Sequence, residues 1–81
     1  MEQKTLHLTL SKVDGPLFNG PILSVTLPGA DGEMTLLPDH EALISFLRPG
    51  VITVRTTQEE QQFQVESGTL EISDNQVTVL L

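Results

Sequence analysis

Apolar and polar residues alternate one by one along most of this chain, and the alternation limits what it can fold into. Successive side chains of an extended strand point to opposite faces, so alternation marks strands with one buried face. The apolar members of the alternating runs are Leu6, Leu8, Leu10, Leu23, Val25, Leu27, Met34, Leu36, Ile52, Val54, Phe63, Val65, Leu70, Ile72, Val77 and Val79. Turn residues interrupt the runs at intervals of about 8–12 residues, as is typical of all-β folds. We therefore predict about seven or eight short strands in an antiparallel β-sandwich or barrel.

The residues between the runs favour tight hairpin turns. Gly32, within Ala30–Glu33, can take the positive φ that a tight hairpin needs. Asp74 and Asn75 tolerate left-handed backbone geometry and predict the last hairpin turn. The polar stretch Gln58–Gln61 is interpreted as a solvated hairpin tip.

The segment His40–Leu47 fits the strand pattern less clearly. Leu43, Phe46 and Leu47 would also line one face of a short helix. We favour a strand, because apolar residues on both faces suit a buried or interface strand. Two interpretations of its apolar side chains stay open: all of them lie in the core, or one face is core and the other meets a partner.

Composition excludes several classes of protein. The chain has 81 residues and no cysteine, so disulfides and thiolate zinc sites are excluded. The net charge of −7 argues against binding to nucleic acid or anionic membrane surfaces, which requires clusters of Lys and Arg. No apolar run approaches the roughly 20 residues of a membrane-spanning helix. The first residues lack a basic segment followed by an apolar one, so we expect no signal peptide.

Residues that could carry catalysis or bind metal are scarce. His7 alternates with leucines and is expected to point outward, with nothing near it in sequence to complete a triad. His40 lies between Asp39 and Glu41, but three consecutive residues of an extended chain converge poorly on one ion. Asp31 and Glu33 flank Gly32 without the alternating acids of a calcium loop. We expect no catalytic residues, no metal site and no cofactor, so the chain is not expected to be an enzyme.

Aromatic residues are equally few. The chain has no Trp or Tyr, and all three phenylalanines, Phe18, Phe46 and Phe63, are interpreted as core residues. A concave site for a carbohydrate or another soluble ligand usually exposes aromatic side chains. Such a ligand-binding sandwich, or an adaptor that captures a peptide along an edge strand, therefore remains only an alternative to a role in docking onto larger protein partners.

Several short motifs, taken in order, resemble one known family. They are Leu17-Phe18-Asn19-Gly20, Gly32-Glu33, Leu36-Leu37-Pro38-Asp39-His40, Leu47-Arg48-Pro49-Gly50, Phe63 to Gly68, Leu70-Glu71-Ile72 and Val77-Thr78-Val79-Leu80. In this order and spacing, the motifs resemble the N-terminal β-sandwich domain of the epsilon subunit of F-type ATP synthases, the equivalent of mitochondrial delta. The resemblance runs without gaps over nearly the whole chain. It implies a flattened antiparallel β-sandwich or barrel of about eight to ten short strands.

The chain departs from the family pattern at three positions. Thr35 stands where the family usually has Gly, Ala42 where it usually has Pro, and Thr69 where a second Gly is common. In the family a helical hairpin follows the sandwich. We expect residues 1–81 to form a single sandwich domain without that hairpin. The final strand, Val77–Leu81, is expected either to be tied into the sheet or to lead into further chain.

The resemblance implies a non-catalytic part of the rotor, in the central stalk. In the family this domain docks on the gamma subunit and on the polar loops of the membrane c-ring, and couples proton translocation to ATP synthesis. Carried over by position, the implied partner interface comprises Glu33, His40 and Leu43. The implied location is the cytoplasmic face of a bacterial inner membrane, reached only through the complex. The isolated domain is expected to be a soluble monomer, since its charge of −7 disfavours self-association.

Overall fold

The computed structural model describes residues 4–81, and the regular elements within this range are all strands. The nine strands are β1 (Leu6–Lys12), β2 (Gly15–Ile22), β3 (Ser24–Gly29), β4 (Gly32–Leu36), β5 (Leu43–Leu47), β6 (Gly50–Arg55), β7 (Glu60–Val65), β8 (Gly68–Ser73) and β9 (Gln76–Leu80). The prediction of an all-β sandwich or barrel is confirmed. The segment Leu43–Leu47 is a strand and not a helix.

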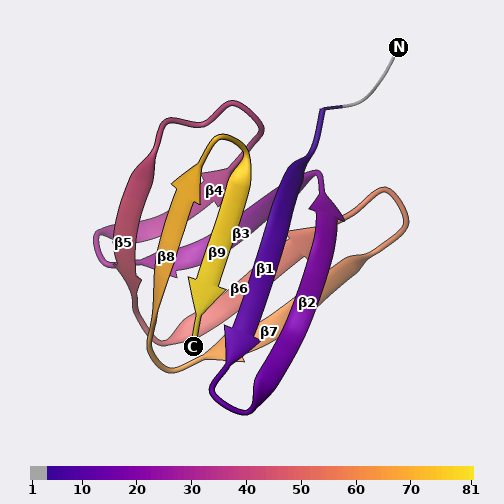
Figure 1. Cartoon of the computed structure of the whole chain (residues 1–81). Coiled ribbons are helices and arrows are strands. Elements are labelled where there is room, and N and C mark those ends of the chain that lie inside the picture. The colour runs from indigo at the N-terminus through magenta and orange to yellow at the C-terminus, as the bar shows by residue number, and fades with distance from the viewer. Residues whose placement is uncertain (1–3) are drawn as a thin grey trace.

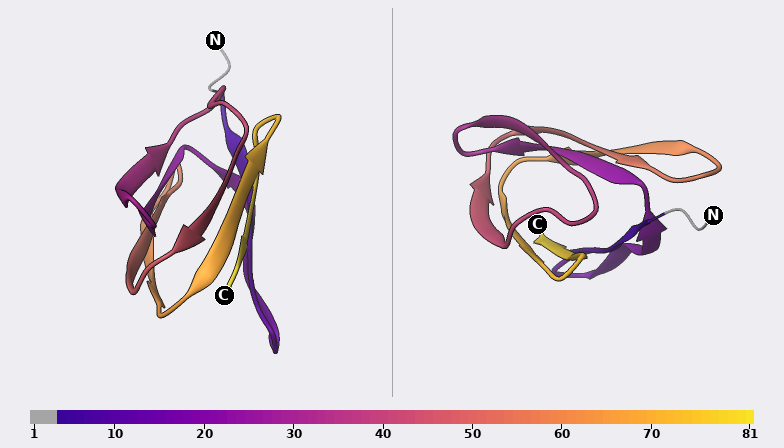
Figure 2. Two further views of the ribbon diagram at one scale, coloured as in Figure 1. Left: turned by 90° about the vertical axis from the view of Figure 1, so that its left-hand side faces the viewer. Right: turned by 90° about the horizontal axis from the view of Figure 1, so that it is seen from above.

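The strands form one curled sheet that folds over on itself into two layers (Figures 1 and 2). Its order is β2-β1-β9-β8-β5-β3-β6-β7, with β4 on the other side of β3. One layer contains β2, β1, β9, β8 and β5, and the other contains β4, β3, β6 and β7. The register that links the layers consists of one pair, Gly29 in β3 with Leu47 in β5. This curled arrangement leaves an interior between the layers for the apolar face of each strand.

Most apolar positions of the alternating pattern fill that interior, whereas Leu23, Met34 and Phe63 are only partly buried. The fully or almost fully buried apolar residues are Leu6, Leu8, Leu10, Ile22, Val25, Leu27, Leu36, Leu47, Ile52, Val54, Val65, Leu70, Ile72, Val77 and Val79. Phe18 and Phe63 are partly buried and pack against this core, in agreement with their predicted role. Each of the nine strands contributes at least one of these buried residues, so the two layers share one core.

Two features of the sheet do not follow from alternation. Strand β2 contains Pro16 and Pro21, and its apolar pattern is broken, so alternation alone does not indicate a strand there. It lies at the sheet edge, where proline is tolerated because no neighbour needs its missing N–H. Strands β1 and β9 pair in parallel, whereas we expected an antiparallel sheet throughout. This pairing brings the first and last strands side by side, and the Leu81 N–H extends it by donating to the Ser11 carbonyl oxygen at 2.9 Å.

The predicted turn chemistry is confirmed at both tight hairpins. Gly32 has a φ of 131° at the end of the β3–β4 turn. Asp74 and Asn75 have φ values of 51° and 61° and form the two-residue turn between β8 and β9. Two consecutive positive φ angles match the hairpin geometry whose twist agrees with that of the strands. The polar tip between β6 and β7 is also exposed, as predicted.

Candidate partner interface

Glu33 lies at the beginning of β4, immediately after the β3–β4 turn. Glu33 is exposed, and its backbone lies opposite Pro28 of β3 in the β3–β4 pair. The turn is held by the pairing of Gly29 with Gly32 on either side of Ala30 and Asp31. No hydrogen bond or ion pair within residues 4–81 occupies the Glu33 carboxylate. A carboxylate beside a tight turn, with no partner among the described residues, is available for a basic group on another protein.

His40 lies in the exposed loop of residues 37–42 between β4 and β5. Its backbone N–H donates to the Leu37 carbonyl oxygen at 3.2 Å. Its Nδ1–H donates to the Glu41 carbonyl oxygen at 2.7 Å, which leaves Nε2 as the acceptor of the neutral ring. Both bonds lie within the loop, and the ring stays exposed to solvent. His40 can therefore offer a hydrogen-bond acceptor to a partner without disturbing the sandwich.

Asp39, next to His40, connects this loop to distant parts of the chain. Its N–H donates to Asn75 Oδ1 at 2.6 Å, and Asn75 Nδ2 donates to Asp39 Oδ1 at 3.2 Å. Lys4 Nζ lies 2.7 Å from Asp39 Oδ2. Hydrogen bonds from Lys4 and then Asn75, with the charge of Lys4, hold the pKa of Asp39 below its ordinary value of 3.8. The same contact raises the pKa of Lys4 above 10.5.

Strand β5 has an inner and an outer face, and this corrects the assignment of Phe46 to the core. Leu47 is buried and Leu43 is partly buried against the core, whereas Ile44 and Phe46 are 77% and 71% exposed. Alternation from the buried Leu47 places Phe46 outside. The first interpretation of this segment, with all of its apolar side chains in the core, is therefore wrong. One face lies in the core and the other is exposed, and that the exposed face meets a partner stays a prediction. In the sequence, Ser45 lies between Leu43 and Leu47 on one face of the strand, and Ile44 and Phe46 share the other face. Knowing that Leu47, near the Pro49-Gly50 turn, is buried would have identified the face of Phe46 as the outward one.

The three predicted interface residues do not form a single cluster. Glu33 and His40 are separated by β4, since Glu33 precedes most of that strand and His40 follows it. At about 3.3 Å per residue, the distance from Glu33 to the end of β4 is already roughly 10 Å. His40 and Leu43 lie at the same end of β5, but Leu43 presents only part of its side chain. The exposed apolar surface beside them comes from Ile44 and Phe46, which the sequence-based set omits.

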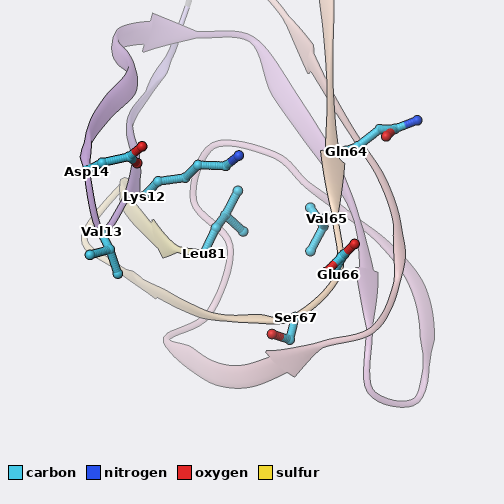
Figure 3. Close-up of a pocket in the computed structure, with 8 residues that line it drawn as sticks. All are labelled: Lys12, Val13, Asp14, Gln64, Val65, Glu66, Ser67 and Leu81. Atoms are coloured by element: carbon cyan, nitrogen blue, oxygen red, sulfur yellow. The ribbon is translucent and has the colours of Figure 1, made fainter.

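At the opposite end of the sandwich is an open hollow of about 560 Å³ (Figure 3). It lies between the β1–β2 turn, with Lys12 and Asp14, and the end of β7, with Glu66. Figure 3 shows Gln64 pointing away from Val65 and Leu81, so the polar groups do not converge on one point. Within residues 4–81, no group of three or more His, Cys, Asp or Glu residues could hold a metal ion. In the same range, no helix is long and apolar enough to cross a membrane.

A comparison with protein families identifies the sandwich. The family described as ATP synthase, Delta/Epsilon chain, beta-sandwich domain matches residues 5–81. The chain belongs to this family. The resemblance inferred from the short motifs is thereby confirmed, and it extends over all nine strands.

Individual members of the ATP synthase delta/epsilon family are similar over nearly the whole chain. An ATP synthase epsilon chain of Nitratiruptor sp. is 37% identical over 78 residues, which cover 95% of this chain and 60% of the relative. One of Bordetella avium is 40% identical over 77 residues, which cover 94% of this chain and 55% of the relative. The chain therefore spans somewhat more than half the length of these relatives.

Two solved structures have the same fold. A chain in the mitochondrial ATP synthase of Euglena gracilis, determined together with the c-ring, matches with a TM-score of 0.87 and 26% identity. The match covers 94% of this chain and 49% of that one. A chain in the central stalk and c-ring of the Tetrahymena thermophila mitochondrial ATP synthase has a TM-score of 0.81. It covers 99% of this chain and 65% of the other, and at 17% identity it shows the fold alone.

Proposed function

We propose that this β-sandwich is a non-catalytic part of the central stalk of an F-type ATP synthase. In this role it docks on the gamma subunit and on the polar loops of the c-ring, and couples proton translocation to ATP synthesis. The observation that carries the proposal is membership of the ATP synthase delta/epsilon family over residues 5–81. The solved chain from Euglena gracilis adds support, because it has the same fold at 26% identity within an ATP synthase.

The mechanical demands of such a role agree with the fold. A part that transmits torque needs a stiff body and two contact surfaces, and it needs no reactive groups. Strands β1, β9, β8, β3 and β6 are each paired on both sides, so the sheet deforms only as a whole. Fifteen buried apolar residues lock the two layers together. Such a body is suited to passing a force from one end to the other, as the proposed role requires.

Glu33 is the residue we propose for the c-ring contact. Its carboxylate is exposed on a tight turn, and no basic residue within residues 4–81 is paired with it. A basic side chain on a ring loop would gain an ion pair there without first breaking one. Such a pair contributes little when fully exposed, but more once the contact excludes water.

His40 and Leu43 are the residues we propose for the gamma contact. His40 offers its Nε2 from a loop that is already internally hydrogen-bonded. Leu43 offers the exposed part of a side chain that otherwise packs on the core. Ile44 and Phe46 enlarge this surface with apolar area that a free-standing sandwich does not need to expose. Apolar area beside a few polar groups is the usual composition of a protein interface.

The decisive experiment reverses the charge at Glu33 in the complete ATP synthase, reconstituted in membrane vesicles. Glu33→Lys is expected to weaken ATP-driven proton pumping while ATP hydrolysis by the detached catalytic head persists. The fold is expected to stay intact, because a solvated turn residue contributes little to stability. Glu59→Lys is the matched control: it makes the same charge change on an exposed residue at the β6–β7 tip, on the other side of the molecule from the β3–β4 turn (Figure 1). Normal coupling in Glu33→Lys together with failure in Glu59→Lys would show that the domain docks in another orientation.

In this function the domain lies at the cytoplasmic face of a bacterial inner membrane and is held there by the complex alone. Apart from the complex, it is expected to be a monomer. Like charges on a chain of net charge −7 oppose self-association. Sedimentation velocity across a range of concentrations tests this expectation, and a persistent dimer that buries β5 would contradict it.

A further inference from the structure

Asp39 and Asn75 lie 36 residues apart in the sequence and are in contact through their side chains. The Asp39 N–H donates to Asn75 Oδ1 at 2.6 Å, and Asn75 Nδ2 donates back to Asp39 Oδ1 at 3.2 Å. Both residues have left-handed backbones, with φ values of 69° and 61°. The loop between β4 and β5 and the turn between β8 and β9 therefore meet through a reciprocal pair of hydrogen bonds.

This pair is the main attachment of the His40 loop. Within residues 4–81, the hydrogen bonds that join residues 37–41 to the rest of the molecule are made by Asp39, to Asn75 and to Lys4. The bonds of His40 stay inside the loop. Leu37 is 56% exposed and does not anchor the loop in the core. Without Asn75, the remaining hydrogen bond from the loop to the rest of the described residues would come from Lys4, a long side chain that is 74% exposed.

We propose that Asn75 is a positioning residue, which holds the His40 loop in its docking conformation by clamping Asp39. The proposal rests on the docking function above. A loop that is ordered before the partner arrives does not lose conformational freedom when it binds, so its affinity is higher. The clamp also makes the loop and the β8–β9 turn a single surface, as both line one hollow together with Ala42, Ser73 and Asp74.

The chain allows the clamp to be removed without disturbing the turn. Asn75→Gly deletes both side-chain hydrogen bonds, and glycine accepts the φ of 61° without strain. Asp followed by Gly is also a favoured sequence for this kind of two-residue hairpin turn. Stability of the β8–β9 hairpin is therefore expected to be retained, while the loop loses its attachment.

A second pair of variants separates the clamp from simple loss of a side chain. Asn75→Asp keeps an acceptor for the Asp39 N–H but sets two carboxylates against each other. Adding Asp39→Asn restores one amide and one carboxylate with their positions exchanged, so a side-chain hydrogen bond can form again. Both replacements tolerate a left-handed backbone. The single variant Asn75→Asp is expected to loosen the loop and weaken binding to gamma, and the double variant is expected to restore both.

The experiment has two readouts. In the isolated 81-residue chain, amide hydrogen exchange at Asp39 is expected to become about five- to tenfold faster in Asn75→Gly, which removes the acceptor of the Asp39 N–H. Exchange is also expected to be faster in Asn75→Asp, because repulsion between the two carboxylates moves the acceptor away from that N–H. Exchange in β6 and β7 stays as in the wild type. Affinity for purified gamma subunit is expected to fall about three- to tenfold in the same two variants, and to recover in the double variant.

The outcomes distinguish the clamp from the docking proposal. Unchanged exchange at Asp39 in Asn75→Gly would overturn the clamp, whatever the binding result. Faster exchange with unchanged affinity for gamma would overturn the positioning role, because loosening the loop would then have no effect on docking. If the wild-type chain shows no affinity for gamma at all, the docking function itself fails, while the exchange result still reports on the contact between Asp39 and Asn75.

Discussion

Gly29 in β3 pairs with Leu47 in β5, and this pair links the register of one layer to that of the other. The site is too crowded for a side chain at position 29. A Cβ there would lie 2.9 Å from the Gly32 carbonyl oxygen and would contact the end of the Met34 side chain. The Met34 side chain can move aside, but the Gly32 carbonyl belongs to a paired strand and cannot. Glycine at this position therefore allows β3 and β4 to approach closely at the point where β3 also pairs with β5.

Replacing Gly29 with alanine is expected to destabilise the fold. The crowding at the Gly32 carbonyl corresponds to a loss of about 1–3 kcal/mol. In a domain of this size, that lowers Tm by roughly 5–20 °C. Thermal unfolding followed by circular dichroism measures the change. Gly20→Ala is the matched control, because its added Cβ would be 3.9 Å from the nearest atom, Phe18 Cε1. Equal melting temperatures for the two variants would contradict the crowding argument.

Truncating Phe63 to alanine is expected to remove a large share of the stability. Phe63 pairs with Ile52 across β6 and β7 and packs on the core while partly exposed. A loss of about 2–4 kcal/mol is expected, near or below the range for fully buried phenylalanine. The whole domain has only about 4–12 kcal/mol at typical stability per residue. Urea unfolding gives the difference directly, with the exposed neighbour Gln62→Ala as reference. A loss of free energy of unfolding below about 0.5 kcal/mol, as is usual for surface substitutions, would place the ring in solvent.

The two faces of β5 are expected to respond differently to substitution. Phe46→Ser changes a side chain that is 71% exposed, so Tm is expected to stay within a few degrees while affinity for the gamma subunit falls. Leu43→Asp places a charge against the core and is expected to lower stability first. Circular dichroism and a binding assay on the same samples separate the two effects. Wild-type affinity in Phe46→Ser would confine the gamma contact to the His40 loop.

The ion pair between Lys4 and Asp39 predicts a pH dependence at both ends of the scale. The depressed pKa of Asp39 gives a contribution that is complete above 3.8 and is lost as pH falls through the pKa of the folded state. The raised pKa of Lys4 gives one that is complete below 10.5 and is lost as pH rises beyond it. The pair therefore stabilises the fold between these limits, weakly, because both groups are fully exposed.

Titration of the Asp39 carboxyl carbon by NMR checks this prediction. Lys4→Met is expected to raise the midpoint toward 3.8, and added salt is expected to act in the same direction. Asn75→Gly is expected to raise it as well, since Asn75 also hydrogen-bonds to the carboxylate. A midpoint that does not respond to Lys4→Met would mean that the two side chains do not pair in solution.

Much of the candidate interface could be anticipated from local chemistry. Glu33 and His40 occupy turn and loop segments that Gly32 and Pro38 mark in the sequence, and both residues are exposed. The assignment of Phe46 to the core is wrong, because apolar residues occur on both faces of β5 and composition alone does not tell which face is buried. The contact of Asp39 with Asn75 had no local signal, since its two members lie 36 residues apart.

The same division holds for the fold. Alternation determined which face of β1 is buried, because the period of side chains along a strand is a property of neighbouring residues. Turn chemistry determined the reversals at Gly32 and at Asp74-Asn75, because only a few residue types accept positive φ. Alternation does not indicate strand β2, because its prolines are acceptable only at an edge, and being at an edge depends on the whole sheet. The parallel pairing of β1 with β9 and the single link between Gly29 and Leu47 were likewise decided by the tertiary structure, because the choice of strand partner depends on how all nine strands close around one core.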